Sequence, residues 1–340
     1  MRDLCLMTSR LTLQQVHELA VQALIASGGD IRQSAVMAQS ITEAEAQGIR
    51  NVGLAYLPTY CEHLLCGKVD GHAIARTEIL APAILGVDAS NGFSHTAFLF
   101  ALPEFVSIVR SQGIAFMTIR NAYSAGVLGW FIHRFLEHGL VSLAFANASA
   151  MMAPVGGRKP VFGTNPWGFG VPQEGAEAIV ADMSSSATAR VNVIAAARTG
   201  GPIPEGWAID VDGRPTTDPQ AALAGTMAPA AGHKGYALAL LVDILIAGLG
   251  GANWSFEASS LLDNSGGPPG VGQCFIAIDP ARCAPGFAER ISRLTQAIYE
   301  QEGARLPGKG RADHVAYANA HGVEVPDDLV TELRALAHPG

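Results

Sequence analysis

Charged side chains are scarce in this sequence, and the basic ones are in the minority. Asp, Glu, Lys and Arg make up 15% of the 340 residues, hydrophobic residues make up 49%, and the formal net charge is −8. A net negative charge argues against the basic patch that binds nucleic acid, so no nucleic-acid partner is expected. So few charges would leave much of a monomer's surface without polar cover, and we therefore predict a homodimer or larger assembly.

Cysteines are few and odd in number, at five. The one close pair, Cys61 and Cys66, has four residues between its members, a spacing typical of neither structural zinc nor a disulfide framework. Free thiols in a reducing cytoplasm are the better interpretation. The histidines, among them His63, His95 and His133, show no metal-ligand spacing, so no metal is expected.

Long apolar runs are absent as well. The most apolar stretch, residues 236–249, contains Asp243 and is too short for a membrane span, so we expect a buried helix and no membrane partner. The chain starts Met-Arg-Asp-Leu-Cys, without the apolar core of a signal peptide, which favours a cytoplasmic location.

The usual dinucleotide-binding fingerprint, Gly-x-Gly-x-x-Gly after a strand, is missing. Its nearest imitation, Gly-Leu-Gly-Gly at residues 248–251, ends a predicted helix instead of opening one. A Rossmann fold is therefore disfavoured. A chain of this length exceeds the usual size of one hydrophobic core, so two lobes or an elaborated single domain are expected.

Two helix-start signals open the part of the chain that is easiest to interpret. Thr12–Gln15 and Asp30–Gln33 both have the pattern of a capping box and are followed by apolar residues at helical spacing. Further helices are predicted over residues 53–66, 96–112, 131–137, 233–249, 287–301 and 326–336. Strands are predicted over residues 79–87, 114–119, 140–146, 178–181 and 273–278.

Residues 156–172 contain five Gly and three Pro. Gly loses backbone entropy on folding and Pro removes a hydrogen-bond donor, so neither a helix nor a regular strand is expected there. The composition instead predicts a backbone that follows a demanding path.

Two segments that follow predicted strands have the chemistry of a nucleotide site. Residues 121–129 lead from a strand into a helix, a geometry that aims free backbone N–H groups at a phosphate, although a simple strand-to-helix turn is the alternative. Asp182, Met183 and Ser184 follow the next such strand, where the Asp either accepts from ribose hydroxyls or caps the helix that follows.

Two basic segments add to this pattern. His233 and Lys234 open an apolar helix, where positive charge opposes the helix dipole, so a bound anion nearby would be favourable; solvation of Lys234 and capping by His233 are the alternative. Residues 305–311 concentrate three basic side chains around a Pro and two Gly, which suits either a phosphate clamp or a solvated loop.

Taken together, residues 156–172, the Asp-Met-Ser at 182–184 and Ala-Gly-His-Lys-Gly-Tyr at 231–236 resemble the malate/L-lactate dehydrogenase-like family of NAD(P)H oxidoreductases. The resemblance runs over roughly residues 11–333 and is nearest to the piperideine-2-carboxylate/pyrroline-2-carboxylate reductase branch. It implies a non-Rossmann α/β fold in which a mainly antiparallel sheet is flanked by helices, after an N-terminal helical region. We expect residues 1–118 with 280–340 to form the helical, substrate-side part and residues 119–279 the sheet-bearing, cofactor-binding core.

The resemblance also implies a set of cofactor contacts from separated loops, with NADP(H) favoured over NAD(H) by the basic segment. These contacts fall on Ser124, Ala125, Gly126, Val127, Leu128, Asp182, Met183, Ser184, His233, Lys234, Arg305, Pro307, Gly308 and Arg311.

The family's reaction centre is replaced in this sequence. Where many members carry Ser-His-Gly and an Arg three residues later, this chain has Asn51, Val52, Gly53 and Tyr56, and Asn192 stands where the branch has an Asp that orients the His. Valine cannot transfer a proton. Asn51, Tyr56, Tyr123 and Asn192 are the candidate catalytic residues.

Two further residues are candidates for substrate binding. Thr164 matches the family's substrate-contacting Thr, and the fork of Arg190 suits a carboxylate. A turn hydroxyl, a solvated arginine and buried tyrosines are the plain alternatives for these residue types.

These replacements favour reduction of a C=N bond in a cyclic or N-substituted 2-imino acid by hydride transfer. An iminium nitrogen already carries its proton, so the reaction needs positioning and electrostatic support more than a strong acid. The alternatives are a 2-oxo acid or 2-hydroxy acid dehydrogenase with a relocated donor such as Tyr123, and a non-catalytic member that binds a nucleotide.

Overall fold

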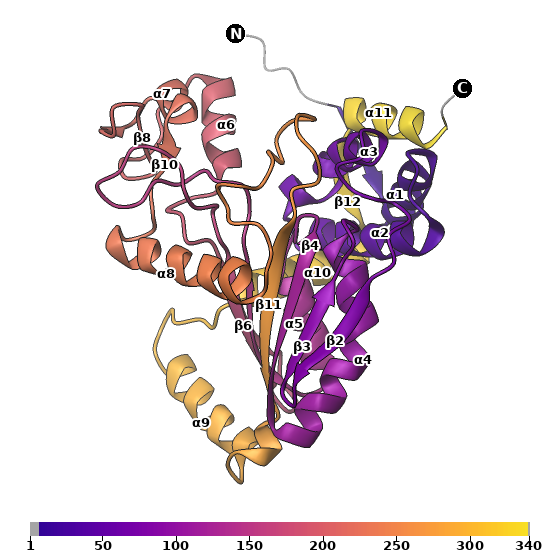
Figure 1. Ribbon diagram of the computed structural model, residues 1–340, viewed down its shortest axis with the longest axis vertical. Coiled ribbons are helices and arrows are strands. Elements are labelled where there is room, and N and C mark those ends of the chain that lie inside the picture. The colour runs from indigo at the N-terminus through magenta and orange to yellow at the C-terminus, as the bar shows by residue number, and fades with distance from the viewer. Residues whose placement is uncertain (1–6, 339–340) are drawn as a thin grey trace.

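A seven-stranded sheet forms the centre of the protein (Figure 1). The structure is a computed structural model that describes residues 7–338. The strand order is β2-β3-β4-β11-β5-β6-β7, and every neighbouring pair is antiparallel except β3 and β4. The strands are β2 (Arg76–Ala81), β3 (Ile84–Asp88), β4 (Ile114–Ala122), β5 (Val141–Ala146), β6 (Trp167–Val171), β7 (Ile179–Met183) and β11 (Val271–Ile278). The predicted fold class, a mainly antiparallel sheet flanked by helices, is confirmed.

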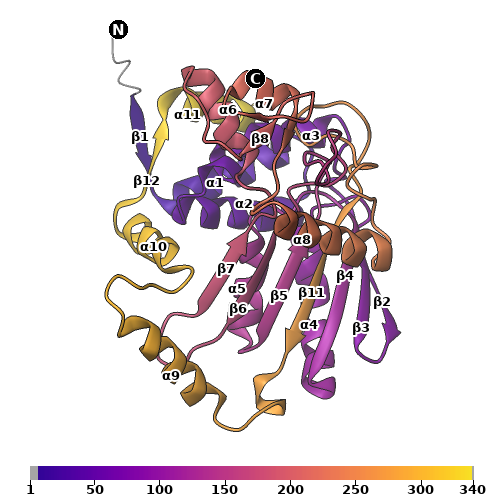
Figure 2. The same ribbon diagram turned by 90° about the vertical axis from the view of Figure 1, so that its left-hand side faces the viewer.

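Helices cover both faces of this sheet. Because side chains alternate along a strand, Phe275 of β11 faces one way and Cys274 the other. Phe275 packs among the aromatic side chains of α4 (Ser94–Gln112) and α5 (Leu128–Glu137). Cys274 packs against α8 (His233–Asp243) and the π-helical segment Ile244–Leu249 that continues it. The predicted helix over 233–249 therefore lies across the opposite face (Figure 2).

The N-terminal helices pack at one end of the sheet with the C-terminal helix. The elements are α1 (Leu13–Ala26), α2 (Ile31–Ala46), α3 (Leu57–Leu65) and α11 (Asp327–Ala337), joined by the antiparallel pair of β1 (Thr8–Leu11) and β12 (Val323–Pro326). The capping box of α1 is confirmed, since Thr12 and Gln15 bond each other's backbone N–H.

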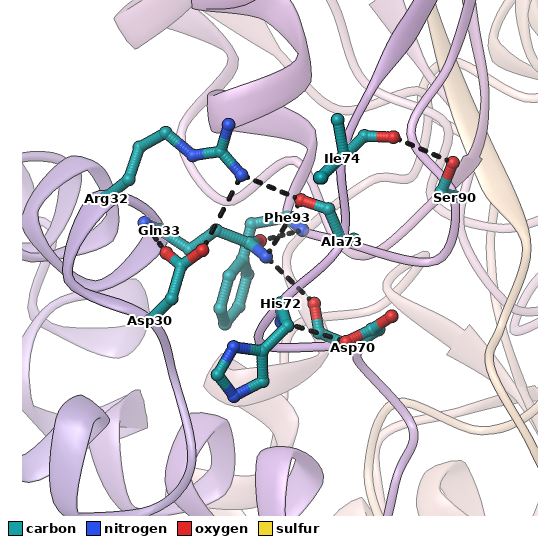
Figure 3. A network of polar contacts seen from close by, with 9 residues as sticks. All are labelled: Asp30, Arg32, Gln33, Asp70, His72, Ala73, Ile74, Ser90 and Phe93. Atoms are coloured by element: carbon teal, nitrogen blue, oxygen red, sulfur yellow. Dashed lines mark hydrogen bonds and ion pairs between the residues drawn. The ribbon is translucent and has the colours of Figure 1, made fainter.

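The second capping box is only half made, because Gln33 has another task (Figure 3). Asp30 accepts from the Gln33 N–H at 2.7 Å, but the Gln33 side chain donates to the Asp70 carbonyl at 3.0 Å and accepts from the Phe93 N–H at 3.1 Å. Phe93 precedes α4, whose first residue, Ser94, donates to the Ser124 carbonyl at 3.0 Å. A buried glutamine thus connects α2 to the start of α4. Ser94, at that start, in turn contacts Ser124 in the loop before α5.

The glycine-rich segment is not wholly irregular, contrary to the prediction, because β6 lies inside it. A Cβ on Gly168 or Gly170 would lie 2.8 or 2.4 Å from atoms of Ile132 in α5. These glycines let the helix approach the strand closely, so here glycine marks packing and not a turn.

Other predicted boundaries were also wrong. The single strand over 79–87 is the hairpin of β2 and β3, which turns at Pro82 and Ala83. The helix over 53–66 starts late, because Arg50–Val52 and Leu54–Tyr56 form 3₁₀ turns before α3. The basic loop over 305–311 runs into the helix α10 (Lys309–His321). The predicted helix over 287–301, by contrast, is confirmed as α9 (Phe287–Tyr299).

A small lobe that the sequence did not predict stands beside the main sheet (Figure 1). It consists of α6 (Arg190–Thr199), α7 (Pro219–Ala224) and a sheet of β8 (Ala208–Ile209), β9 (Pro215–Thr216) and β10 (Thr226–Met227). Its own core contains Val193, Ala208 and Met227. The main sheet takes strands from both sides of residue 118, and the predicted division of the chain at that point stays a prediction. In the described part of the chain no helix is both long and apolar enough to cross a membrane.

Candidate functional site

The loop between β4 and α5 is a turn lined with unused backbone donors. Gly126 has φ +59°, and its N–H donates to Ser124 Oγ at 3.3 Å. Ala125, Val127 and Leu128 are at most 7% exposed, yet among residues 7–338 no acceptor binds their N–H groups. Buried backbone N–H groups are nearly always paired, so this loop fits an anion that supplies oxygen atoms.

Three of the predicted cofactor segments meet at the start of α5. Asp182 Oδ2, at the end of β7, accepts from the Gly129 N–H at 3.0 Å and from Arg311 Nη1 at 3.3 Å. Gly308, at φ +93°, lies so close to β7 that a Cβ would be 3.0 Å from the Val180 carbonyl oxygen. Figure 2 shows α10 beside the β7 edge of the sheet.

The other predicted cofactor residues surround this point less tightly. Ser184 Oγ donates to the Thr164 carbonyl at 3.0 Å, and Met183 is exposed at the end of β7. Arg305 is exposed, and so is Pro307. His233 and Lys234 are exposed at the start of α8, and within residues 7–338 no hydrogen bond or ion pair connects them to Asp182 or Arg311.

The start of α8 has an unusual backbone. Ala231 has φ +49° and Gly232 has φ +61°, and a non-glycine residue rarely adopts this left-handed conformation. Strain of this kind is retained where the surrounding structure requires it, often beside a ligand.

The predicted catalytic residue Asn51 lies exposed on a 3₁₀ turn. Glu45 holds the backbone that follows this turn. Glu45 Oε1 accepts from the Leu54 N–H at 2.7 Å, and a Cβ on Gly53 would be 2.3 Å from that oxygen. Burial raises the pKa of Glu45. Asn192 lies on α6 and donates to Thr188 Oγ1 at 2.7 Å, so the structure gives it a local partner.

Tyr123 is completely buried and bonds the side chain of His63. His63 Nε2 lies 3.1 Å from the Asp263 carbonyl oxygen, which only accepts, so Nε2 carries the proton and Nδ1 accepts from the Tyr123 hydroxyl. Burial raises the pKa of Tyr123 and lowers that of His63. Both groups therefore stay neutral near pH 7.

Three side chains of the α3 region hold a loop that lies in the segment between α8 and β11. Tyr56 donates to the Leu261 carbonyl at 2.7 Å, His63 to that of Asp263, and the buried Lys68 to those of Ser260 and, at 2.9 Å, Asp263. We call residues 255–263 the clamped loop. At its start, Ser255 Oγ donates to the buried Asp243 at 2.8 Å. The sequence did not predict this role for His63 and Lys68. Both bind backbone carbonyls, which every residue has, so the sequence of the loop carries no sign of the contact.

Arg190 lies beside the clamped loop, in a pocket of about 420 Å³. Its Nη2 donates to the Leu223 carbonyl at 3.1 Å, and burial lowers its pKa. The pocket is lined by Ser149, Ala150, Met151, Pro160, Arg190, Gly225, Ser255, Phe256, Ala258, Ser260 and Leu262. Thr164 is half-buried in the loop before β6, and its side chain does not belong to this lining. Among residues 7–338 there is no cluster of His, Cys, Asp and Glu that would hold a metal ion.

Sequence comparison finds close relatives along nearly the whole chain. Residues 11–334 match the profile described as malate/L-lactate dehydrogenase. A (2R)-3-sulfolactate dehydrogenase (NADP(+)) of Chromohalobacter salexigens is 41% identical over 97% of this chain and 99% of its own. A Delta(1)-pyrroline-2-carboxylate reductase of Ancylobacter novellus is 37% identical over 97% of this chain and 98% of its own.

A solved structure matches as closely as these sequences. The delta1-piperideine-2-carboxylate reductase from Pseudomonas syringae superposes with a TM-score of 0.92 at 36% identity, over 97% of this chain and all of that one.

Proposed function

The chain belongs to the malate/L-lactate dehydrogenase family of oxidoreductases, and from this premise we propose that it reduces the C=N bond of a cyclic or N-substituted 2-imino acid with NADP(H). The observation that carries the proposal is that Ala125, Val127 and Leu128 are buried residues whose N–H groups have no acceptor within residues 7–338. A dinucleotide pyrophosphate supplies the oxygen atoms that these N–H groups lack. The relatives named as pyrroline- and piperideine-2-carboxylate reductases support the substrate class.

The residues around this loop fit the rest of the cofactor. Asp182, Met183 and Ser184 would hold a ribose, and Arg305, Pro307, Gly308 and Arg311 would surround a 2′-phosphate, with His233 and Lys234 as further cationic contacts. The bidentate geometry of Arg311 suits a phosphate, which supports NADP(H) over NAD(H). When bound, the nicotinamide supplies the hydride.

The protein side of the reaction is positioning and not strong acid catalysis. Val52 cannot donate a proton, and the Tyr123 hydroxyl donates to His63. An iminium substrate brings its own proton on nitrogen, so Asn51, Tyr56, Tyr123 and Asn192 need only stabilise and orient the ring. Thr164 would contact the substrate from the loop before β6.

A second candidate function is oxidation of a 2-hydroxy acid or reduction of a 2-oxo acid. The sulfolactate dehydrogenase of Chromohalobacter salexigens, at 41% identity, favours it. A ketone develops negative charge on oxygen as hydride arrives and requires a proton donor. In this structure the Tyr123 hydroxyl donates to His63, so this second function requires that hydroxyl to turn from His63 to the substrate.

We also propose a cytoplasmic homodimer. Leu240, Leu241, Ile244 and Leu249, along α8 and its continuation, are 39% to 66% exposed, an apolar row that suits a second copy of the chain. Cys61, Cys66, Cys274 and Cys283 are free thiols, which is typical of a reducing compartment.

The test is to titrate the protein with NADPH and NADH and then to follow NADPH oxidation with pyrroline-2-carboxylate, piperideine-2-carboxylate, pyruvate and sulfopyruvate. We expect tight NADPH binding and faster turnover of the imines. Arg311→Met should weaken NADPH binding about 10-fold and NADH binding by less, because it removes the phosphate contact and also the ion pair that holds Asp182, whereas Arg293→Met on α9 should change neither. Faster turnover of a 2-oxo acid would favour the second function, and binding of neither nucleotide would overturn both.

A further inference from the structure

Within residues 7–338 the half-buried cation of Arg190 has no counter-ion. It begins α6, its Nη2 is held by the Leu223 carbonyl, and no Asp or Glu of residues 7–338 forms an ion pair with it. Removing a guanidinium from water without a negative partner is unfavourable. The unfolded chain does not have this cost, so the native fold retains Arg190 at the expense of stability.

Two more polar groups of the same pocket lack partners. Arg190 Nε is buried, and in the described part of the chain neither it nor Ser149 Oγ has a hydrogen-bond partner; Ser149 is 5% exposed. Both residues line the pocket. The helix that Arg190 begins has Ala189 as its N-cap, which contributes no side-chain acceptor. Guanidinium, hydroxyl and helix N-terminus are all donors, so what this place lacks is an acceptor with negative charge.

The rest of the lining is neutral and mostly apolar. Met151, Pro160, Phe256 and Leu262 contribute hydrocarbon, and no Asp or Glu lines the pocket. A volume of about 420 Å³ is ample for a five- or six-membered ring with one acid group. The clamped loop supplies Phe256, Ala258 and Leu262, so one wall of the pocket depends on the contacts that Tyr56, His63 and Lys68 make behind it.

We propose that this pocket binds the carboxylate of the substrate, with Arg190 and Ser149 as its two side-chain donors and the clamped loop as the wall that selects the substituent. This rests on the proposed function, which supplies a 2-imino acid as the substrate. The pocket takes over the acid-binding task of the arginine that Tyr56 replaces. It also selects for an acid over its neutral amide, because a neutral group leaves the half-buried guanidinium without a counter-ion.

The experiment measures binding without turnover. Pyrrole-2-carboxylate, a planar ring acid that cannot accept hydride, is titrated into the protein by calorimetry, alone and with saturating NADPH, and pyrrole-2-carboxamide serves as the neutral match. We expect Arg190→Met to weaken binding of the acid about 30-fold and Ser149→Ala about 5-fold. Arg190→Lys, which retains the charge without the fork, should fall between wild type and Arg190→Met. Arg198→Met, an exposed arginine at the other end of α6, is the control and should bind as wild type.

The outcomes separate this proposal from the proposed function. Acid binding that depends on Arg190 supports the pocket even if NADPH does not bind. NADPH binding and imine turnover with equal acid affinity in wild type and Arg190→Met overturn the pocket and leave the reductase. Equal binding of acid and amide also overturns it, and so does a site that takes inorganic sulfate but not pyrrole-2-carboxylate.

Discussion

Two arginines of this protein, one buried and one half-buried, have opposite electrostatic surroundings. Arg134 on α5 is 7% exposed, pairs with both carboxylate oxygens of Glu43 at 3.1 and 2.5 Å, and lies 4.2 Å over the ring of Trp130. Arg190 on α6 has one backbone carbonyl as its partner. Arg134 has its negative charge within the chain and connects α2 to α5, whereas no Asp or Glu in the described residues 7–338 pairs with Arg190. We therefore expect a structural role for Arg134 and, as proposed above, a binding role for Arg190.

The two arginines should differ most in what the loss of their charge does to the stability of the protein. Arg134→Met leaves Glu43 without its partner and loses the contact with Trp130, so we expect the free energy of unfolding to fall by about 3 kcal/mol. Arg190→Met removes an uncompensated charge and should change it by less than about 0.5 kcal/mol or raise it. Urea denaturation at pH 7.5 measures both, and equal losses would contradict the distinction.

A second prediction concerns the pH dependence around Arg134. His95 lies between Trp130 and Phe131, bonds Ser40 at 3.0 Å, and has a pKa that burial and, secondarily, the Arg134 charge lower to about 3. The unfolded chain, with a pKa near 6.5, then binds more protons than the native one, so stability is complete above that pH and is lost as pH falls below it. Between pH 7.5 and pH 5 this histidine alone should remove about 2 kcal/mol.

His95→Gln should flatten that pH slope whatever it does to stability at pH 7.5. His138→Gln, at an exposed position after α5, is the matched control and should leave the slope unchanged. Urea titrations at a series of pH values give the slope, and equal slopes in the two variants would show that His95 is not the group responsible.

A third prediction concerns a bound acid, which would give Arg190 the negative partner that Glu43 gives Arg134. At a concentration of pyrrole-2-carboxylate ten times its Kd, the folded state should gain about 1.4 kcal/mol. Wild type and Arg134→Met should both show this increase, and Arg190→Met should lose it at the same concentration. Thermal or urea unfolding with and without the acid measures the gain, and protection of Arg190→Met would contradict the assignment.

The smallest expected effect belongs to an arginine that is paired but exposed. Arg214 lies 3.6 Å from Asp212 with a side chain 78% exposed. Water screens this pair, so Arg214→Met should change the free energy of unfolding by about 0.5 kcal/mol or less. A loss as large as that of Arg134→Met would show that pairing, and not burial, decides the energy.

The sequence was most informative where a structure is set by neighbouring residues. The cap of α1 at Thr12 and the end of α4 at Gln112 were predicted because both depend on the local backbone. Strand β6 was missed for the opposite reason. Its glycines are explained by Ile132, a residue of α5 that local patterning does not connect to them.

The candidate site divides in the same way. The cofactor segments were each recognised locally or by resemblance, and the structure adds the contact between Asp182 and Arg311 across 129 positions. Their roles, like those of the catalytic candidates, stay predictions. Ser149 carries no pattern at all in the sequence, and its importance rests on what surrounds it: burial, the lack of a partner, and Arg190 in the same pocket.

The clamped loop has a consequence for how such a protein acquires new substrates. Tyr56, His63 and Lys68 grip carbonyl oxygens, which every amino acid carries, while Phe256 and Leu262 extend from the same loop into the pocket. Mutations of Phe256 and Leu262 therefore change the lining of the pocket and leave the hydrogen bonds to the backbone of the clamped loop in place. The substrate range can therefore change at this place with little loss of stability. Phe256 and Leu262 are the first positions to randomise in a directed-evolution library.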